Sequence, residues 1–517
     1  MASTACDARP RTEDLMTDCS IPVPTGAGSA SSATRSSRVP HLALAAGMAA
    51  LLLGALAGCS SDSGGTADPT TGATRKASAP VRLPVPDGFA TETGWSTSAS
   101  PEASDVEPGS SGFPLVAVAP KSGQVIQAAA DGSRVRAFAL ASGKTVWTFT
   151  PKALAGVRAG VFVQEGKAGE KVVLARQGKT SGSGLSTSRR TITIDVIAAD
   201  SAGKATAAHH LDLSAPADMA ASFTATDSGF LVGPVIDGVH EKAVAIDAAT
   251  GVQRTVAKTS VTVSGCGSES CAVQASPAFA TSQGVVSAFQ QQGGCDQWTD
   301  GGTPCTYGFQ VGGAWTSTSV APRGMHVGIP LAVTGPYLVT AWHTSDTQTD
   351  QPALSDTKKT ILAVHDLATG KIKAQVSCSS ADALTLQPGS AQSSTHLSPN
   401  GDFLVSGQVG FDLATGRGRC FTSTTSTKGI DLTAVADDGT AYGLVHVTDD
   451  TDAASLYGRL PIAQDGTDTS ERDSARVSLR SGAAKALPGA SEVPVYVASD
   501  GHGVFCTRDV VAVYPGS

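Results

Sequence analysis

The segment 361–370 reads ILAVHDLATG, and close copies of it recur along the chain. Residues 243–251 read AVAIDAATG and residues 409–416 read VGFDLATG, while 196–203 (VIAADSAG) and 477–482 (VSLRSG) hold looser copies. An apolar run that ends in Asp or a small residue predicts a strand leading into a capped turn. The closing Gly supplies the positive φ that a tight turn needs before the next strand. We therefore expect one short-stranded unit to be repeated.

The spacing of these units predicts how they assemble. Seven turn glycines lie 46 to 66 residues apart, which is the period of a propeller with loop insertions: Gly143, Gly203, Gly251, Gly313, Gly370, Gly416 and Gly482. A single four-stranded sheet cannot bury both of its faces, so neighbouring sheets must stack and the ring must close. The sequence predicts an all-β propeller of seven or eight four-stranded blades over 113–517, with eight favoured. A strand near 88–95 is expected to complete the last blade.

The repeat also carries a family resemblance. The pattern (apolar)-x-Ala-(apolar)-Asp-x-x-Thr-Gly-x-x-x-Trp resembles the repeat of the pyrroloquinoline-quinone (PQQ)-type β-propeller, and residues 137–147 are its closest copy. Trp147 takes the tryptophan position of the family, which holds Thr255, Ala374 and Cys420 in other copies. The family includes quinoprotein dehydrogenases and non-enzymatic outer-membrane assembly lipoproteins. The resemblance implies a propeller fold over most of the chain.

The quinone-dependent members of that family hold their cofactor between a tryptophan and a disulfide of adjacent cysteines, with a calcium ion and a catalytic Asp. This chain has no adjacent pair of cysteines. It also lacks the GxSxG, HExxH and Walker patterns of common hydrolases and nucleotide-binding proteins. We therefore expect no cofactor, no metal and no catalytic residue, although a quinone-dependent enzyme is kept as an alternative.

The N-terminal region predicts where the protein lies. Arg35 and Arg38 precede an apolar stretch at 42–57, and residues 51–59 read LLLGALAGC, which resembles a bacterial lipobox. The resemblance implies that residues 1–58 are a signal, that Cys59 is lipidated, and that 59–112 is a flexible linker. An uncleaved N-terminal anchor is the alternative. Either interpretation places the folded part at the outer face of the cytoplasmic membrane.

Seven cysteines follow Cys59, and an extracytoplasmic location permits disulfides. Two pairs are close in sequence and flank tight loops, so we expect them to be bridged: Cys266 with Cys271, and Cys295 with Cys305. Cys378 with Cys420 is a third pairing, which leaves Cys506 as a buried free thiol. Zinc is the competing interpretation, but neither a CxxC motif nor a nearby pair of histidines supports it.

Other candidate residues are fewer. His209, His210 and Asp212 are potential metal ligands, but adjacent residues on a strand point to opposite faces, so we expect an ordinary strand end. The acidic runs at 449–452 and 465–468 lack the spacing of a calcium loop. Trp298, on the 295–305 loop, and the nearby Tyr307 are expected to form a binding surface. Trp315 and Trp342, by contrast, are expected to be core residues.

The chain carries a formal net charge of −8, which argues against binding to nucleic acid. A repeated scaffold without a recurring catalytic set favours a non-catalytic binding or scaffold protein. The expected partners are the membrane, through the lipid on Cys59, and an envelope protein or cell-wall polymer. The alternative is a small-ligand sensor or a quinone-dependent enzyme that uses the central channel.

Overall fold

The computed structural model describes most residues from Val81 to Ser517, within a unit that spans Ala77–Ser517. The residues outside the description are 1–80, 100–113, 155–156, 167–168, 181–188, 217–221, 237–238, 241, 248, 267–268, 291–306, 326, 344–359, 379–387, 390, 425, 446–472, 490 and 508–509.

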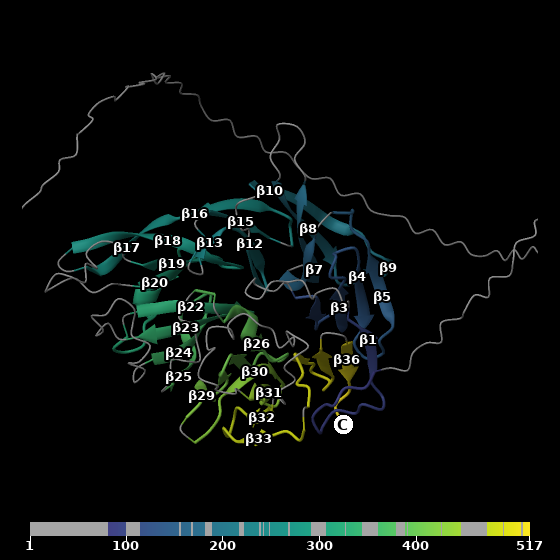
Figure 1. Cartoon of the computed structure of the whole chain (residues 1–517). Helices are drawn as coiled ribbons and strands as arrows, with labels where there is room; N and C mark the ends of the chain where they lie inside the picture. The colour runs from purple at the N-terminus through teal and green to yellow at the C-terminus, as the bar shows by residue number, and fades with distance from the viewer. Residues whose placement is uncertain are drawn as a thin grey trace, which may run out of the picture. The chain divides into compact units, whose positions relative to one another are not determined.

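The described chain is almost entirely short strands that pair antiparallel with their neighbours (Figure 1). The first runs of four are β2 (Val116–Ala119), β3 (Gln124–Ala128), β4 (Val135–Ala139), β5 (Thr145–Phe149); β6 (Arg158–Gly166), β7 (Gly169–Thr180), β8 (Arg189–Ala198), β10 (Ala207–Pro216); and β11 (Ser222–Thr226), β12 (Gly229–Gly233), β15 (Lys242–Ile246), β16 (Gln253–Ala257). The next are β18 (Glu269–Thr281), β19 (Gly284–Gln290), β20 (Tyr307–Val311), β21 (Trp315–Thr316); β22 (Val327–Thr334), β23 (Tyr337–His343), β24 (Thr360–Asp366), β25 (Ile372–Cys378); and β26 (Thr395–Leu397), β27 (Phe403–Ser406), β28 (Val409–Asp412), β29 (Arg417–Cys420). The last are β30 (Ile430–Val435), β31 (Thr440–Val445), β32 (Ser474–Ser478), β33 (Ala484–Ala486); and β34 (Tyr496–Val497), β35 (Gly503–Cys506), β36 (Val510–Tyr514), β1 (Trp95–Ser98).

Shorter elements join these runs. They are the hairpin β13 (Val235–Ile236) and β14 (Val239–His240), the short helix α1 (Ser317–Val320) and the 3₁₀ turn η4 (Gln392–Ser394). Two sheets have a fifth strand: β9 (Gly203–Lys204) pairs parallel with β5, and β17 (Thr259–Cys266), a strand of full length, pairs antiparallel with β18. We call each four-stranded run a blade and name it by its strands. One sheet combines the β22–β25 and β26–β29 blades through a parallel pair between Gln375 and Arg417. The count of seven or eight blades stays a prediction, as do the expected domain boundaries.

The repeated turn is built as the sequence indicates. In the β24–β25 turn, Asp366 Oδ1 accepts hydrogen bonds from the Thr369 backbone N–H at 2.9 Å and from its hydroxyl at 2.8 Å. Gly370 then adopts φ +72° and lets the chain turn back into β25. These hydrogen bonds hold the carboxyl of Asp366 in its charged form and lower its pKa, although partial burial acts in the opposite direction. The Asp-x-x-Thr-Gly pattern is therefore a turn signal.

The ring is closed by a strand from the start of the described chain. In the last sheet β1 pairs antiparallel with β36, with Trp95 opposite Val513, and Figure 1 shows the two side by side. The Leu83 backbone N–H donates to the Tyr514 hydroxyl at 2.9 Å, which ties the preceding segment to the same sheet. The segment expected to close the ring, 88–95, holds a single bridge from Phe89 to Gly516, and the paired strand begins only at Trp95. This closure, with the stacked four-stranded sheets, makes the fold an all-β propeller.

Tryptophans join neighbouring blades. The Trp147 indole N–H lies 3.0 Å from the carbonyl oxygen of Ala199, in the turn of the next blade. The Trp315 indole N–H donates to the Leu367 carbonyl oxygen at 2.9 Å. Trp315 is 8% exposed and packs against the glycine of that turn, where a Cβ at Gly370 would lie 2.9 Å from the indole. Each blade therefore fixes the position of the next.

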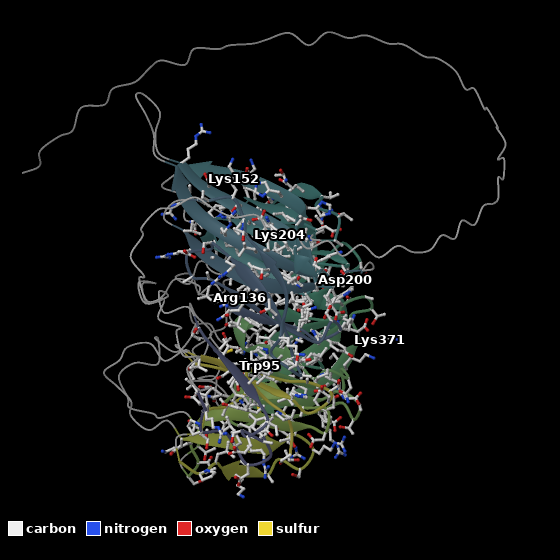
Figure 2. The ribbon with its side chains drawn as sticks, turned by 90° about the vertical axis from the view of Figure 1, so that its right-hand side faces the viewer. Trp95, Arg136, Lys152, Asp200, Lys204 and Lys371 are labelled. Atoms are coloured by element: carbon white, nitrogen blue, oxygen red, sulfur yellow. A yellow bond between two sulfur atoms is a disulfide. The ribbon has the colours of Figure 1, made fainter. Side chains whose placement is uncertain are left out.

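Other side chains dock in the same way where tryptophan is missing. A Cβ at Gly251 would lie 2.7 Å from the His209 ring, and a Cβ at Gly482 would lie 2.7 Å from an Arg419 nitrogen. Trp95 completes the set at the closing blade, because its indole N–H donates to the Leu140 carbonyl oxygen at 2.7 Å (Figure 2). The inter-blade contact is thus kept while the residue that makes it changes.

Candidate ligand-binding groove

A cavity of about 320 Å³ lies between the β26–β29 and β30–β33 blades. It forms where three turns meet: the turn before β27, the β28–β29 turn, and the turn after β32. We call it the groove, and its lining residues are Asp402, Phe403, Asp412, Ala414, Thr415, Arg417, Arg419, Leu479 and Arg480. Most of these side chains are charged, so the groove differs from the apolar contacts that stack the blades.

The floor of the groove is aromatic. Phe403 is 2% exposed and belongs to the core cluster that joins the two blades. The Arg480 guanidinium carbon lies 5.2 Å from the centre of the Phe403 ring, which is the geometry of a cation–π contact. The Arg480 side chain is exposed, so this contact orients the guanidinium while its N–H groups stay accessible.

One wall is fixed by Arg419. Its Nε donates to the Leu479 carbonyl oxygen at 2.8 Å, and Nη2 donates to the Arg480 carbonyl oxygen. The guanidinium also lies against Gly482, which has φ +80° and no side chain to displace it. The donors of Arg419 are therefore used in the contact between the two blades. Its side chain forms part of the wall of the groove, and few of its donors are left for a ligand.

The carboxylates have structural partners of their own. Asp412 is 8% exposed, and its Oδ1 accepts a hydrogen bond from the Thr415 backbone N–H at 3.0 Å. Asp402 Oδ2 accepts from the Asn400 side-chain amide at 3.1 Å. Each carboxylate keeps a second oxygen, so both can accept further hydrogen bonds from a bound group.

Arg417 is the second accessible cation. It is exposed, and its backbone lies opposite Asp412 in the β28–β29 ladder. Within the described part of the chain, neither Arg417 nor Arg480 makes an ion pair. The groove therefore presents two guanidinium groups and two carboxylates whose hydrogen-bonding capacity is only partly used.

Several residues singled out in the sequence fall outside the description. Cys59, Cys295, Trp298 and Cys305 lie outside the described residues. Cys266, Cys271 and Tyr307 are placed as strand residues of β17, β18 and β20, but their side chains are not described. The two close cysteine pairs and the Trp298–Tyr307 surface therefore stay predictions.

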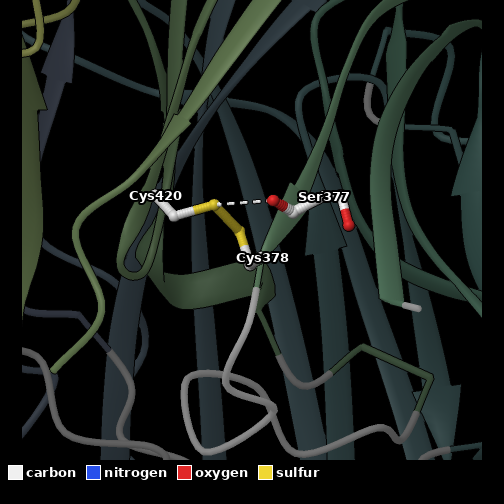
Figure 3. Close-up of a disulfide and its surroundings, with 3 residues drawn as sticks. All are labelled: Ser377, Cys378 and Cys420. Atoms are coloured by element: carbon white, nitrogen blue, oxygen red, sulfur yellow. Dashed lines mark hydrogen bonds between the residues drawn. A yellow bond between two sulfur atoms is a disulfide. The ribbon is translucent and has the colours of Figure 1, made fainter. Parts of the chain in front are cut away.

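The third cysteine pairing is present in the structure. Cys378, the last residue of β25, and Cys420, the last residue of β29, form a disulfide (Figure 3). It joins the outer strands of two blades beside the parallel pair of Gln375 and Arg417. Cys506 is a free thiol as expected, although the residue is partly rather than fully buried, and desolvation raises its pKa to about 12. A thiol with that pKa is almost fully protonated at neutral pH and hence a poor nucleophile.

His209 and His210 point to opposite faces of their strand, as expected for adjacent residues in a β-strand. His209 lies against Gly251, whereas His210 Nδ1 lies 2.5 Å from Asp195 Oδ1. Asp195 is buried and also accepts a hydrogen bond from Arg176 at 3.2 Å. The hydrogen bond to Asp195 raises the pKa of His210 above its usual value. Among the described residues no group of three or more His, Cys, Asp or Glu side chains is arranged to hold a metal ion.

Sequence reasoning missed the groove. Its strongest signal is the run RGR at 417–419 directly after the turn glycine Gly416, combined with Arg480, which lies two residues before the turn glycine Gly482 of the next repeat. Each arginine alone is an ordinary surface residue, and only the stacking of the two blades brings them together. Trp315 and Trp342, at 8% and 0% exposed, are core residues as predicted. None of the helices in the described residues has the length and apolar character to cross a membrane.

Comparisons with known proteins return structural neighbours only. No family model and no curated protein matches the chain. The β-propeller domain of Cps50 (Swd1) from Myceliophteria thermophila has a TM-score of 0.36 at 8% identity, covering 79% of this chain and 97% of that one. Dipeptidyl peptidase 4 from Porphyromonas gingivalis has a TM-score of 0.37 at 10% identity, with 79% and 58% covered. The WD40 domain of SCAP from fission yeast has a TM-score of 0.27 at 9% identity, with 78% and 84% covered.

Proposed function

We propose that this protein is a membrane-anchored lipoprotein with PQQ-like propeller repeats, acting as a non-catalytic binding or scaffold protein at the outer face of the cytoplasmic membrane. The lipid would be attached to Cys59, and the propeller would hold a partner from the envelope. The groove carries the binding part of this proposal, and the lipobox-like segment 51–59 carries the anchoring part.

The hydrogen bonds of the groove support binding more than chemistry. Arg419 is engaged with two backbone carbonyls, and Asp412 accepts a backbone N–H of its own turn. Side chains held in this way are preorganised, so a ligand meets them without a large loss of conformational entropy. An acid–base mechanism needs a side chain that can exchange a proton near the operating pH. The groove is lined instead by arginines and turn-capping carboxylates.

Membrane fractionation tests the anchor. The intact protein is expected in the membrane fraction and to incorporate a labelled fatty acid. The Cys59→Ala variant is expected to lose the label. Equal labelling of both proteins would refute lipidation at Cys59.

A pull-down from gently solubilised membranes tests the binding role. An envelope protein captured by the intact protein is expected to be lost with Arg417→Ala and Arg480→Ala. It is expected to be retained with Lys485→Ala, which removes an exposed charge from β33 outside the groove. Equal capture of the envelope protein by the intact protein and by both arginine variants would contradict a role for the groove. Substrate turnover by the purified protein would contradict a non-catalytic role.

A further inference from the structure

We propose that the groove binds a peptide segment of a partner protein, and that an acidic side chain of that segment lies between Arg417 and Arg480. This inference rests on the proposed binding function and names the chemistry of its ligand. The two guanidiniums come from different blades, line the same cavity of about 320 Å³ and are both exposed. A carboxylate placed between them can accept charge-assisted hydrogen bonds from either side.

The two aspartates distinguish a peptide from a dense polyanion. Asp402 and Asp412 line the same cavity as the arginines, so a polymer with a charge on every unit would bring anions against both carboxylates. A peptide in an extended conformation directs successive side chains to opposite sides and advances about 3.3 Å per residue. It therefore offers one carboxylate to the arginines while its backbone N–H groups or a basic side chain face the aspartates.

The surface beside the groove extends the positive charge. Lys371 and Lys373, at the start of β25, are both exposed, and Lys371 is labelled in Figure 2. They lie beside the β28–β29 turn, because a Cβ at Gly416 would be 3.1 Å from the Lys373 carbonyl oxygen. Asp366 lies close enough to Lys373 to interact with it electrostatically, so the two lysines are partly balanced by one carboxylate. The lysine that remains unbalanced adds a positive charge beside the groove, which favours the approach of an acidic segment to Arg417.

The strands and turns that carry the groove arginines are held by several contacts. Strand β29, which carries Arg417, pairs with β25 at Gln375 and is covalently joined to it at Cys420. Arg480 follows β32 and is held over Phe403. The backbone beneath both arginines is therefore held in place, and the cost of ordering on binding falls mainly on the exposed side chain of Arg417.

Fluorescence anisotropy with the purified full chain tests this inference. The probe is a labelled octapeptide that alternates Glu with Ser and carries one Lys, and its matched control replaces each Glu by Gln. We expect saturable binding of the Glu peptide that weakens as salt is raised, and binding at least about tenfold weaker for the Gln peptide. Arg417→Ala and Arg480→Ala are each expected to weaken binding of the Glu peptide about tenfold or more. Lys485→Ala, a matched loss of one exposed charge, is expected to change it less than about twofold.

Three results would overturn the inference. One is the absence of saturable binding at millimolar probe, and another is equal binding of the Glu and Gln peptides. The third is tighter, arginine-dependent binding of inorganic polyphosphate, which would assign the groove to a polyanion. Circular dichroism and thermal unfolding of each variant show whether a loss of binding is a loss of fold. The assay does not involve the membrane, so failure of the anchor at Cys59 would leave its result unchanged.

Discussion

Replacing Gly143 by Ala separates the energy of blade docking from the energy of the turn itself. Gly143 has φ +66°, and a Cβ added there would lie 2.6 Å from the Trp95 ring. Gly203 occupies the corresponding turn of the next blade, with φ +64° and nothing within 4 Å of its added Cβ. Figure 2 shows Asp200 and Lys204, on either side of that residue, at the surface. Gly203→Ala is therefore a matched control.

The magnitudes follow from these contacts. Both substitutions place a side chain in the left-handed region, which costs about 1–2 kcal/mol in each case. Only Gly143→Ala also displaces Trp95, which removes the hydrogen bond to the Leu140 carbonyl oxygen, worth about 1 kcal/mol. Part of the apolar burial of that half-buried ring is lost as well, at about 1–2 kcal/mol. We expect Gly143→Ala to lower the free energy of unfolding by about 2–3 kcal/mol more than Gly203→Ala.

Urea unfolding at equilibrium measures both values from the midpoint and slope of each transition. Trp95→Phe, which keeps a ring but loses the indole N–H, is expected to lose about 1 kcal/mol. Equal destabilisation by Gly143→Ala and Gly203→Ala, within about 0.5 kcal/mol, would show that Trp95 contributes nothing to closure, and the reasoning would be refuted.

Three further predictions concern the buried ion pair, the histidine beside it and the disulfide. Arg176→Met is expected to destabilise the protein by up to about 3–5 kcal/mol in urea unfolding, because the buried Asp195 loses its permanently charged partner and keeps the partly exposed His210. Adding Asp195→Leu should recover part of this loss, and a double variant no more stable than Arg176→Met would contradict this. The pKa of His210 is raised, so its contribution to stability is fully present below about pH 6.5 and is lost as the pH rises through its folded pKa. The difference in unfolding free energy between wild type and His210→Gln should therefore shrink from about pH 5.5 to about pH 8.5. A constant difference would argue against the contact with Asp195. Reduction of the Cys378–Cys420 disulfide should lower the unfolding free energy by up to about 4 kcal/mol, which is the chain-entropy value for a bridge between residues 42 apart. If this bridge accounts for most of the effect of the reductant, the stability of the Cys378→Ser/Cys420→Ser variant should change little on reduction.

The turn was predictable from the sequence because its cause is local. Asp366, Thr369 and Gly370 lie within five residues of one another, and their hydrogen bonds and positive φ depend only on that segment. The same holds for the alternation that places His209 and His210 on opposite faces. A propeller could be expected on these grounds, since repeated units of this size must stack to bury their faces.

The docking contacts were not predictable because their spacing from the turn varies. Trp147 follows its turn glycine by four residues, whereas Arg419 follows Gly416 by three and Trp315 follows Gly313 by two. A search at a fixed offset finds Cys420 where Arg419 makes the contact. The outer strands differ in length and bulging, so the sequence offset does not transfer from blade to blade.

The groove lay beyond sequence reasoning for a related reason. Arg417 and Arg480 are 63 residues apart in the chain, and only inter-blade stacking brings them to one cavity. The lipid on Cys59 and the surface at Trp298 stay predictions of the sequence, as do the disulfides expected within the two close pairs.

Closure by β1 has a consequence for the order of folding. The hydrogen bond from Leu83 to Tyr514 spans 431 residues, and the ladder between Trp95 and Val513 spans nearly as many. Contacts so distant in sequence form late, after the local hairpins. During synthesis the blades can stack one by one, and Trp95 can contact the first blade early, but β1 has no strand partner until β36 has been made. Until that moment the apolar residues of the first blade that pack on the last sheet, such as Val125 and Leu140, stay without the valines of β35 and β36 that cover them.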